Sequence, residues 1–168
     1  DTILFFSRLP IIILSVLLGL GLFLWARSLG GVLAGLIALT LYAFDPNIIA
    51  HNHYVTTDLG SAAFIFLAFY GFVRFLENPT PKMILLAGVT LGLAQLTKFS
   101  ALLILPVFGL FVILYALSQT SANWQERLRH LFSYAPRFTA VIVVTFSLVW
   151  IGYAINTSGM PAIKVAEH

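Results

Sequence analysis

The chain has 168 residues, of which 60% are hydrophobic and 9% are charged, and its mean hydropathy is +1.00. A soluble domain carries about 25% charged residues, and a soluble fold of this size cannot bury so much apolar surface in one core. The composition therefore excludes a soluble domain and predicts an integral, multi-pass membrane protein. The net charge of +3 is small and scattered, which argues against nucleic acid as a partner, and the lack of Cys excludes disulfides and thiolate metal sites.

Six apolar segments approach the length of roughly 20 residues that a helix needs to cross a bilayer. In chain order they cover residues 9–26, 30–44, 58–76, 83–97, 99–117 and 138–155. The predicted fold class is an all-α, polytopic transmembrane helical bundle of about six spans, with residues 1–168 in a single transmembrane domain. The chain starts at Asp1 without a Met or a basic leader region, so we interpret it as a fragment of a larger membrane domain.

Lys98 separates the fourth and fifth segments. One unbroken helix over residues 83–117 would be roughly 50 Å long, far more than the ~30 Å hydrocarbon core. We therefore predict a turn at Lys98 between two helices, and a kink at Pro106 in the second of them.

Two pairs of glycines, Gly31/Gly35 and Gly88/Gly92, have the spacing that lets helices approach closely. We predict that they pack helices within one bundle. A dimer face is the alternative.

The basic residues predict the orientation. With six spans, six of the nine Lys and Arg residues lie on one side of the membrane and three on the other. The side with six is expected to be cytoplasmic. That side holds Arg27, Arg74, Lys82, Arg127, Arg129 and Arg137, and the other holds Arg8, Lys98 and Lys164. The loop of residues 45–58, which has no Lys or Arg, then faces outward.

Residues 121–136 are the one polar stretch with a helical pattern. Trp124, Leu128 and Phe132 recur at helical spacing, with Arg127 and Arg129 between them. This pattern predicts an interfacial segment on the cytoplasmic surface of the membrane. The alternative is an ordinary polar connector.

The loop of residues 45–58 concentrates the groups that could carry chemistry, with two of the six acidic residues and two of the four histidines. Polar clusters at a membrane boundary are costly and tend to be functional. Asp58 begins the third segment, where a carboxylate can either stabilise the helix start or face a pocket, and the two roles are compatible. Asp45 precedes Pro46 and is interpreted as a structural helix-to-turn residue.

His51 and His53 flank one residue. On an extended stretch they would point the same way and could share a divalent metal with Asp58. They could instead contact a substrate or a phosphate, or bind lipid headgroups or the loop backbone. Lys98, on the same outer side, is either a lysine that extends to the interface or a partner for a lipid phosphate or for Asp58.

These residues resemble a known family. The pattern consists of Pro46, Ala50-His51 and Thr57-Asp58, then Asn78-Pro79 and Lys82, then the run from Leu85 to Lys98, preceded by Ser7-Arg8-Leu9-Pro10 and the turn from Ala26 to Gly31. It is similar to the protein O-mannosyltransferase and aminoarabinose transferase group, which is glycosyltransferase family 39-like and has the GT-C fold. The resemblance covers about residues 7–110.

The resemblance implies a membrane glycosyltransferase that moves a sugar from a polyprenyl-phosphate carrier to a protein or lipid acceptor on the periplasmic or lumenal side. It implies a bacterial inner membrane, with the loop of residues 45–58 outside. Asp58 matches the acidic residue of the family's second outer loop and would have a supporting role. The family's principal acidic motif, which would supply the general base, lies in a first outer loop, which we expect to precede Asp1.

The alternative is a non-enzymatic membrane subunit of a larger complex, built on a partial GT-C-like module and held by other membrane subunits. A transporter is a third reading, for which Gln95 and Lys98 would be the intramembrane polar groups.

Overall fold

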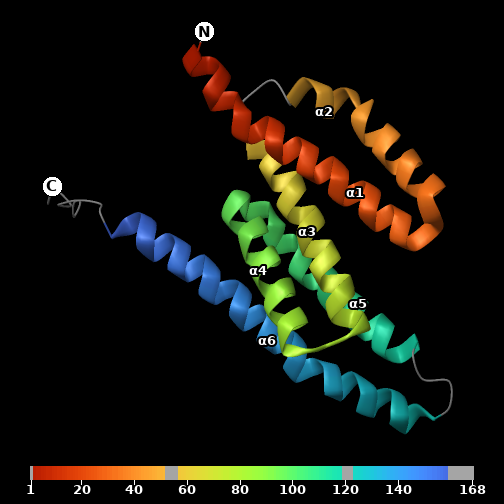
Figure 1. The fold of residues 1–168 in the computed structure, drawn as a ribbon. Helices are drawn as coiled ribbons and strands as arrows, with labels where there is room; N and C mark the ends of the chain where they lie inside the picture. The colour runs from red at the N-terminus through yellow and green to blue at the C-terminus, as the bar shows by residue number, and fades with distance from the viewer. Residues whose placement is uncertain (1, 52–56, 119–122, 159–168) are drawn as a thin grey trace, which may run out of the picture. The chain divides into compact units, whose positions relative to one another are not determined.

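The computed structural model describes residues 2–51, 57–118 and 123–158, and every regular element in these ranges is a helix. The elements are α1 (Thr2–Ala43), α2 (Pro46–His51), α3 (Thr57–Glu77), α4 (Pro81–Thr97), the 3-10 helix η1 (Phe99–Leu103), α5 (Ile104–Ser118) and α6 (Trp124–Thr157), as Figure 1 shows. The predicted all-α fold is confirmed.

The helices group into two compact units, Asp1–Phe66 and Leu67–His168, which we call the amino-terminal and carboxy-terminal units. In the first, α1 is broken at Gly30 and Gly31, and Gly31 has φ 79° and ψ −177°. Only glycine adopts this conformation readily, because a Cβ would clash with the backbone. The break turns α1 into two arms, residues 2–29 and 32–43, which lie side by side in Figure 1.

The two arms are joined by polar and close apolar contacts. The Tyr42 hydroxyl donates a hydrogen bond to the Ser15 carbonyl at 2.9 Å. The hydroxyl oxygens of Ser15 and Tyr42 also lie 2.9 Å apart. A Cβ at Gly35 would lie 2.9 Å from the Phe23 carbonyl oxygen. Gly35 therefore packs one arm on the other as predicted. The packing role predicted for Gly31 is wrong, because this residue forms the turn.

The core of the amino-terminal unit joins α1 to the start of α3. Leu18, Leu59 and Ala63 are buried together, and Tyr42 and Ile48 are among the half-buried side chains around them. This core fixes the start of α3 against the arms of α1.

In the carboxy-terminal unit, α4 packs closely on α6. A Cβ at Gly88 would lie 2.6 Å from the Val144 side chain, and one at Gly92 would lie 3.1 Å from the Thr145 carbonyl oxygen. The Thr145 hydroxyl donates to the Gly88 carbonyl at 3.1 Å. Gly88 and Gly92 thus pack two helices of one chain, as the sequence predicted.

Stacked aromatic rings form the centre of this unit. Phe72 of α3 and Phe108 of α5 are 2% and 0% exposed, and their rings stack with centroids 3.8 Å apart. Phe69 meets Phe108 edge to face at 5.0 Å. These contacts join α3 to α5.

The predicted turn at Lys98 is confirmed. Lys98 has an extended backbone (φ −152°, ψ 120°) between the end of α4 and the start of η1. The predicted kink at Pro106 is displaced, since the backbone changes from 3-10 to α-helix at Ile104 and Pro106 lies in the first turn of α5. Its missing N–H is harmless in a first turn, where that group has no helical partner.

Four helices are long and apolar enough to cross a membrane within the described ranges: Arg8–Ala43, Asp58–Glu77, Phe99–Ser118 and Trp124–Thr157. The first of these contains the break of α1, and α4 is a shorter apolar helix. Five of the six predicted apolar segments lie wholly in helices, and the segment 30–44 does so up to Ala43. This agrees with the expected polytopic bundle, whereas the number of about six spans stays a prediction.

The side chain of Gln95 in α4 lacks a hydrogen bond that a buried amide normally makes. Its Nε2 is buried and has no hydrogen-bond partner among the described residues. An unsatisfied buried amide costs about 1–3 kcal/mol, so Gln95→Met, which keeps the shape, should raise the stability by about 1 kcal/mol or more in thermal melting in detergent. The same change at the exposed Gln125 should leave stability nearly unchanged. A loss of stability in Gln95→Met would show that the amide has a partner.

Candidate functional site

The site begins with the turn that follows α1. Asp45 Oδ1 accepts hydrogen bonds from the backbone N–H groups of Asn47 at 2.8 Å and Ile48 at 3.1 Å. Asp45 thus caps α2, and Pro46 is the first residue of that helix, where a missing N–H costs nothing. The prediction that Asp45 is structural is confirmed.

Asp58 lies in the first turn of α3 and is exposed. Its neighbour Leu59 is 2% exposed and belongs to the core of the amino-terminal unit, so the buried leucine fixes this turn. Asn47, Ile48, Asp58 and Leu59 line a shallow cavity of about 170 Å³. The helix start favours a negative charge at Asp58, and the carboxylate remains accessible to a ligand.

Asn47 is the residue that sequence reasoning missed. It lies in the same polar stretch as Asp45 and lines the cavity with Asp58. Its place in the cavity depends on the short helix α2, in whose first turn Asn47 lies, and the sequence was interpreted as a turn there. The carboxylate and the amide together offer oxygen ligands and one N–H donor group.

Of the two histidines in the loop, the structure describes only the backbone of His51. His51 is the last residue of α2, so it does not lie on the extended stretch for which a metal shared with His53 and Asp58 was considered. A Pro at the first position and an Asp cap make the short helix favourable. The His51 side chain and all of His53 lie outside the described residues.

Within the described residues, no three His, Asp or Glu side chains are grouped as metal ligands. Asp58 is the one member of the predicted set whose side chain is described. The set of Asp58, His51 and His53 therefore stays a prediction.

Lys98 is exposed and lies between α4 and η1. Its backbone N–H donates to the Ala94 carbonyl at 3.1 Å, and its carbonyl accepts from the Ala101 N–H at 3.0 Å, which holds the turn. Lys98 belongs to the carboxy-terminal unit and Asp58 to the amino-terminal unit. Their pairing, and contact of Lys98 with a lipid phosphate, stay predictions.

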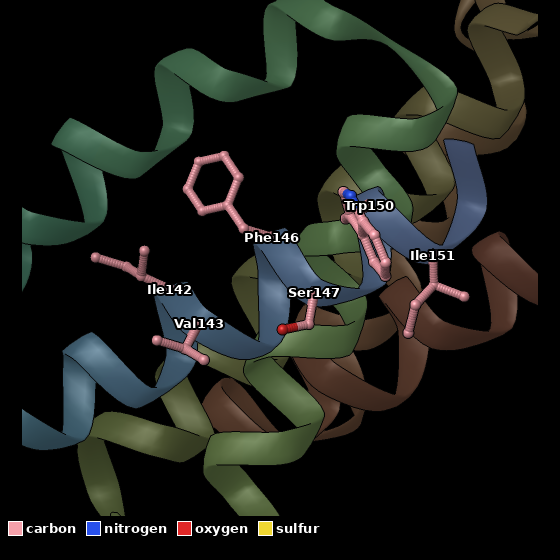
Figure 2. Close-up of a pocket in the computed structure, with 6 residues that line it drawn as sticks. All are labelled: Ile142, Val143, Phe146, Ser147, Trp150 and Ile151. Carbon is pink, nitrogen blue, oxygen red and sulfur yellow. The ribbon is translucent and has the colours of Figure 1, made fainter. Parts of the chain in front are cut away.

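A larger hollow, of about 570 Å³, lies on α6 and is shown in Figure 2. It is lined by Ile142, Val143, Phe146, Ser147, Trp150 and Ile151, none of which titrates. Side chains of this kind on a membrane-spanning helix are suited to contact with lipid chains. We assign no chemistry to it.

Comparison with known proteins adds one finding. Residues 4–151 match the family model described as dolichyl-phosphate-mannose-protein mannosyltransferase. Searches of curated proteins and of solved structures found no match. The match extends over both compact units and all seven helical elements. Together with the apolar helices, it shows that the chain belongs to the dolichyl-phosphate-mannose-protein mannosyltransferase family, a family of membrane glycosyltransferases of the GT-C type.

Proposed function

We propose that the protein transfers a sugar from a polyprenyl-phosphate carrier to a protein or lipid acceptor on the outer side of the membrane. The family match over residues 4–151 carries this proposal. The cavity that contains Asp58 supports it, because it places an accessible carboxylate at one end of a membrane helix. In a bacterium this location would be the periplasmic face of the inner membrane.

The reaction sets the demands on the site. A hydroxyl oxygen of the acceptor forms a bond to the anomeric carbon of the sugar, and the bond from that carbon to the phosphate oxygen breaks. The electron pair leaves with the lipid phosphate, and the hydroxyl proton passes to a general base. Negative charge that develops on the phosphate is stabilised by a cation or by N–H donors.

Asp58 has a supporting role in this proposal. Its carboxylate can accept a hydrogen bond from a sugar or acceptor hydroxyl, and the Asn47 amide can donate one from the same cavity. Lys98 is a candidate cation for the phosphate.

A divalent metal is a candidate cofactor, because the carboxylate of Asp58 and the oxygen of Asn47 are hard ligands of the type that Mg²⁺ and Mn²⁺ favour. His51 and His53 are the further candidate ligands. When bound, the metal would neutralise charge on the departing phosphate. Asp58 would hold it beside the helix start.

The first prediction for this function is that Asp58→Asn lowers sugar transfer tenfold or more, since a carboxylate that holds a metal or orients a reactant usually contributes that much. Asn can also stabilise a helix start, so the fold should persist. Transfer is measured on the protein that includes the outer loop expected before Asp1, in proteoliposomes with polyprenyl-phosphate-[³H]mannose, as label released from the donor lipid.

Glu77→Gln is the matched control. Glu77 lies at the other end of α3 in an exposed ion pair with Arg74 at 3.1 Å, and such pairs are worth little. It should keep transfer within about twofold of wild type. Unchanged transfer in Asp58→Asn would remove Asp58 from the mechanism. No donor cleavage by the wild type, together with purification in fixed ratio with other subunits, would favour the non-enzymatic subunit.

A further inference from the structure

The amino-terminal part of α6 differs from the rest of the helix. Its 34 residues form one helix through Pro136, which is about 51 Å long at 1.5 Å per residue. Residues 138–157 alone would span the ~30 Å hydrocarbon core. Residues 124–137 therefore extend to the boundary of the bilayer or beyond it. They hold every acidic and basic residue of the helix: Glu126, Arg127, Arg129, His130 and Arg137.

One face of this extension is fixed to the bundle. Tyr134 is 5% exposed, and its hydroxyl donates to the Leu76 carbonyl at 3.0 Å. Its ring meets Phe75 and Tyr115 edge to face, with centroids 6.2 and 6.0 Å apart. Because Tyr134 is held by α3 and α5, the direction of the other faces of the extension is fixed too.

A second face is apolar and exposed. Trp124 and Phe132 are 62% and 71% exposed, and they are eight residues apart, a spacing that places them on one side of a helix. Large aromatic side chains at this level are typical of the membrane interface, where the ring lies among the lipid headgroups.

The third face is polar and hollow. Glu126, Arg129, His130 and Ser133 line a cavity of about 360 Å³. The Ser133 hydroxyl donates to the His130 carbonyl at 2.7 Å, and the His130 ring lies 5.8 Å from the Tyr134 ring. Within the described residues, no ion pair joins Glu126 to Arg129 or His130. The Arg129 guanidinium is thus exposed on this face with its N–H donors available.

We propose that this cavity binds the phosphate of an anionic phospholipid. Arg129 supplies the planar donors that match phosphate oxygens, and Arg137 adds positive charge one or two turns along the helix. The exposed Trp124 and Phe132 lie on a different face of the same segment. Aromatic side chains of this kind place the segment among lipid headgroups, which favours a lipid over free phosphate as the source of the anion. The negative charge of Glu126 repels the bound phosphate and therefore limits the affinity for the lipid. This proposal does not depend on the proposed sugar transfer.

The test uses the whole protein in detergent, titrated with phosphatidylglycerol and read by native mass spectrometry as the dissociation constant of the first lipid. Arg129→Gln should weaken binding about fivefold, the contribution of one basic residue at an anionic membrane surface. Glu126→Gln should strengthen it by a similar factor. Two changes of opposite sign on one face distinguish a binding site from a general loss of structure.

Lys82→Gln is the matched control, because it removes one exposed positive charge on the predicted cytoplasmic side without touching the cavity, and it should leave the constant unchanged. Phosphatidylcholine should bind equally to all variants. The proposal is overturned if Arg129→Gln and Lys82→Gln behave alike, or if millimolar inorganic phosphate displaces the lipid, which would identify a free-phosphate site.

Discussion

Phe108→Ala should destabilise the protein by about 3 kcal/mol. Phe108 is 0% exposed, stacks on Phe72 at 3.8 Å and meets Phe69 edge to face at 5.0 Å. Its removal leaves a cavity where α3 and α5 meet. Substitutions of this kind cost about 3–5 kcal/mol in soluble proteins, and we expect the lower end because apolar transfer contributes less when the alternative environment is lipid.

Phe111→Ala is the control, on the same helix but 46% exposed. Both variants are unfolded in mixed detergent micelles and followed by circular dichroism. Phe111→Ala should lose less than about 1 kcal/mol, since an exposed side chain leaves no cavity. Equal losses in the two variants would mean that the stacked rings are not the centre of this unit.

Gly88→Val should also cost about 3 kcal/mol, by overpacking. A Cβ at Gly88 would lie 2.6 Å from Val144 Cβ and 3.0 Å from the Val141 carbonyl oxygen. To admit the side chain, α4 and α6 must separate, which breaks the 3.1 Å hydrogen bond from Thr145 to the Gly88 carbonyl. Overpacking usually costs about 1–3 kcal/mol, and contact with the helix backbone leads us to expect the upper end. Thermal melting in detergent measures the loss.

Gly60→Ala is the matched control for a helical glycine, because among the described residues no atom outside its own stretch of helix lies within 4 Å of the added Cβ. It should be neutral or stabilising by about 0.5–1 kcal/mol, since alanine favours a helix. A second test combines Gly88→Ala with Val144→Ala, which removes the nearest obstacle. The double variant should be more stable than the sum of the single changes predicts. Strict additivity would contradict the contact.

Local signals in the sequence were enough to predict the long helices. Long apolar runs placed them, and Lys98 interrupted one of them. The short helix α2 was not predicted, because Asp45-Pro46 was interpreted as a turn after a helix rather than as the start of one. A turn between residues 9–26 and 30–44 was expected, and the structure places it at Gly30 and Gly31. The sequence did not reveal that Gly31 belongs to this turn and has no packing role, because its spacing from Gly35 also fits a packing motif.

The candidate site was predictable in part. Asp58 could be singled out because a charged residue begins an apolar helix, and its exposure agrees with an accessible role. Asn47 could not, because its place beside Asp58 depends on α2, a helix of six residues. A helix this short shows no helical repeat of apolar residues in the sequence. Its stability depends on its cap and on the packing of Ile48.

The break in α1 has a consequence for the thickness of the membrane around the protein. The second arm, residues 32–43, covers about 18 Å at 1.5 Å per residue, whereas the hydrocarbon core is about 30 Å thick. A segment this short is accommodated by local thinning of the bilayer or by drawing its polar end below the headgroups. Asp45 and then α2, which contains Asn47, follow this arm directly. Under the proposed function, the mismatch would place their polar groups at the depth where a lipid-linked phosphate is presented, so the substrate would not have to leave the bilayer to be reached.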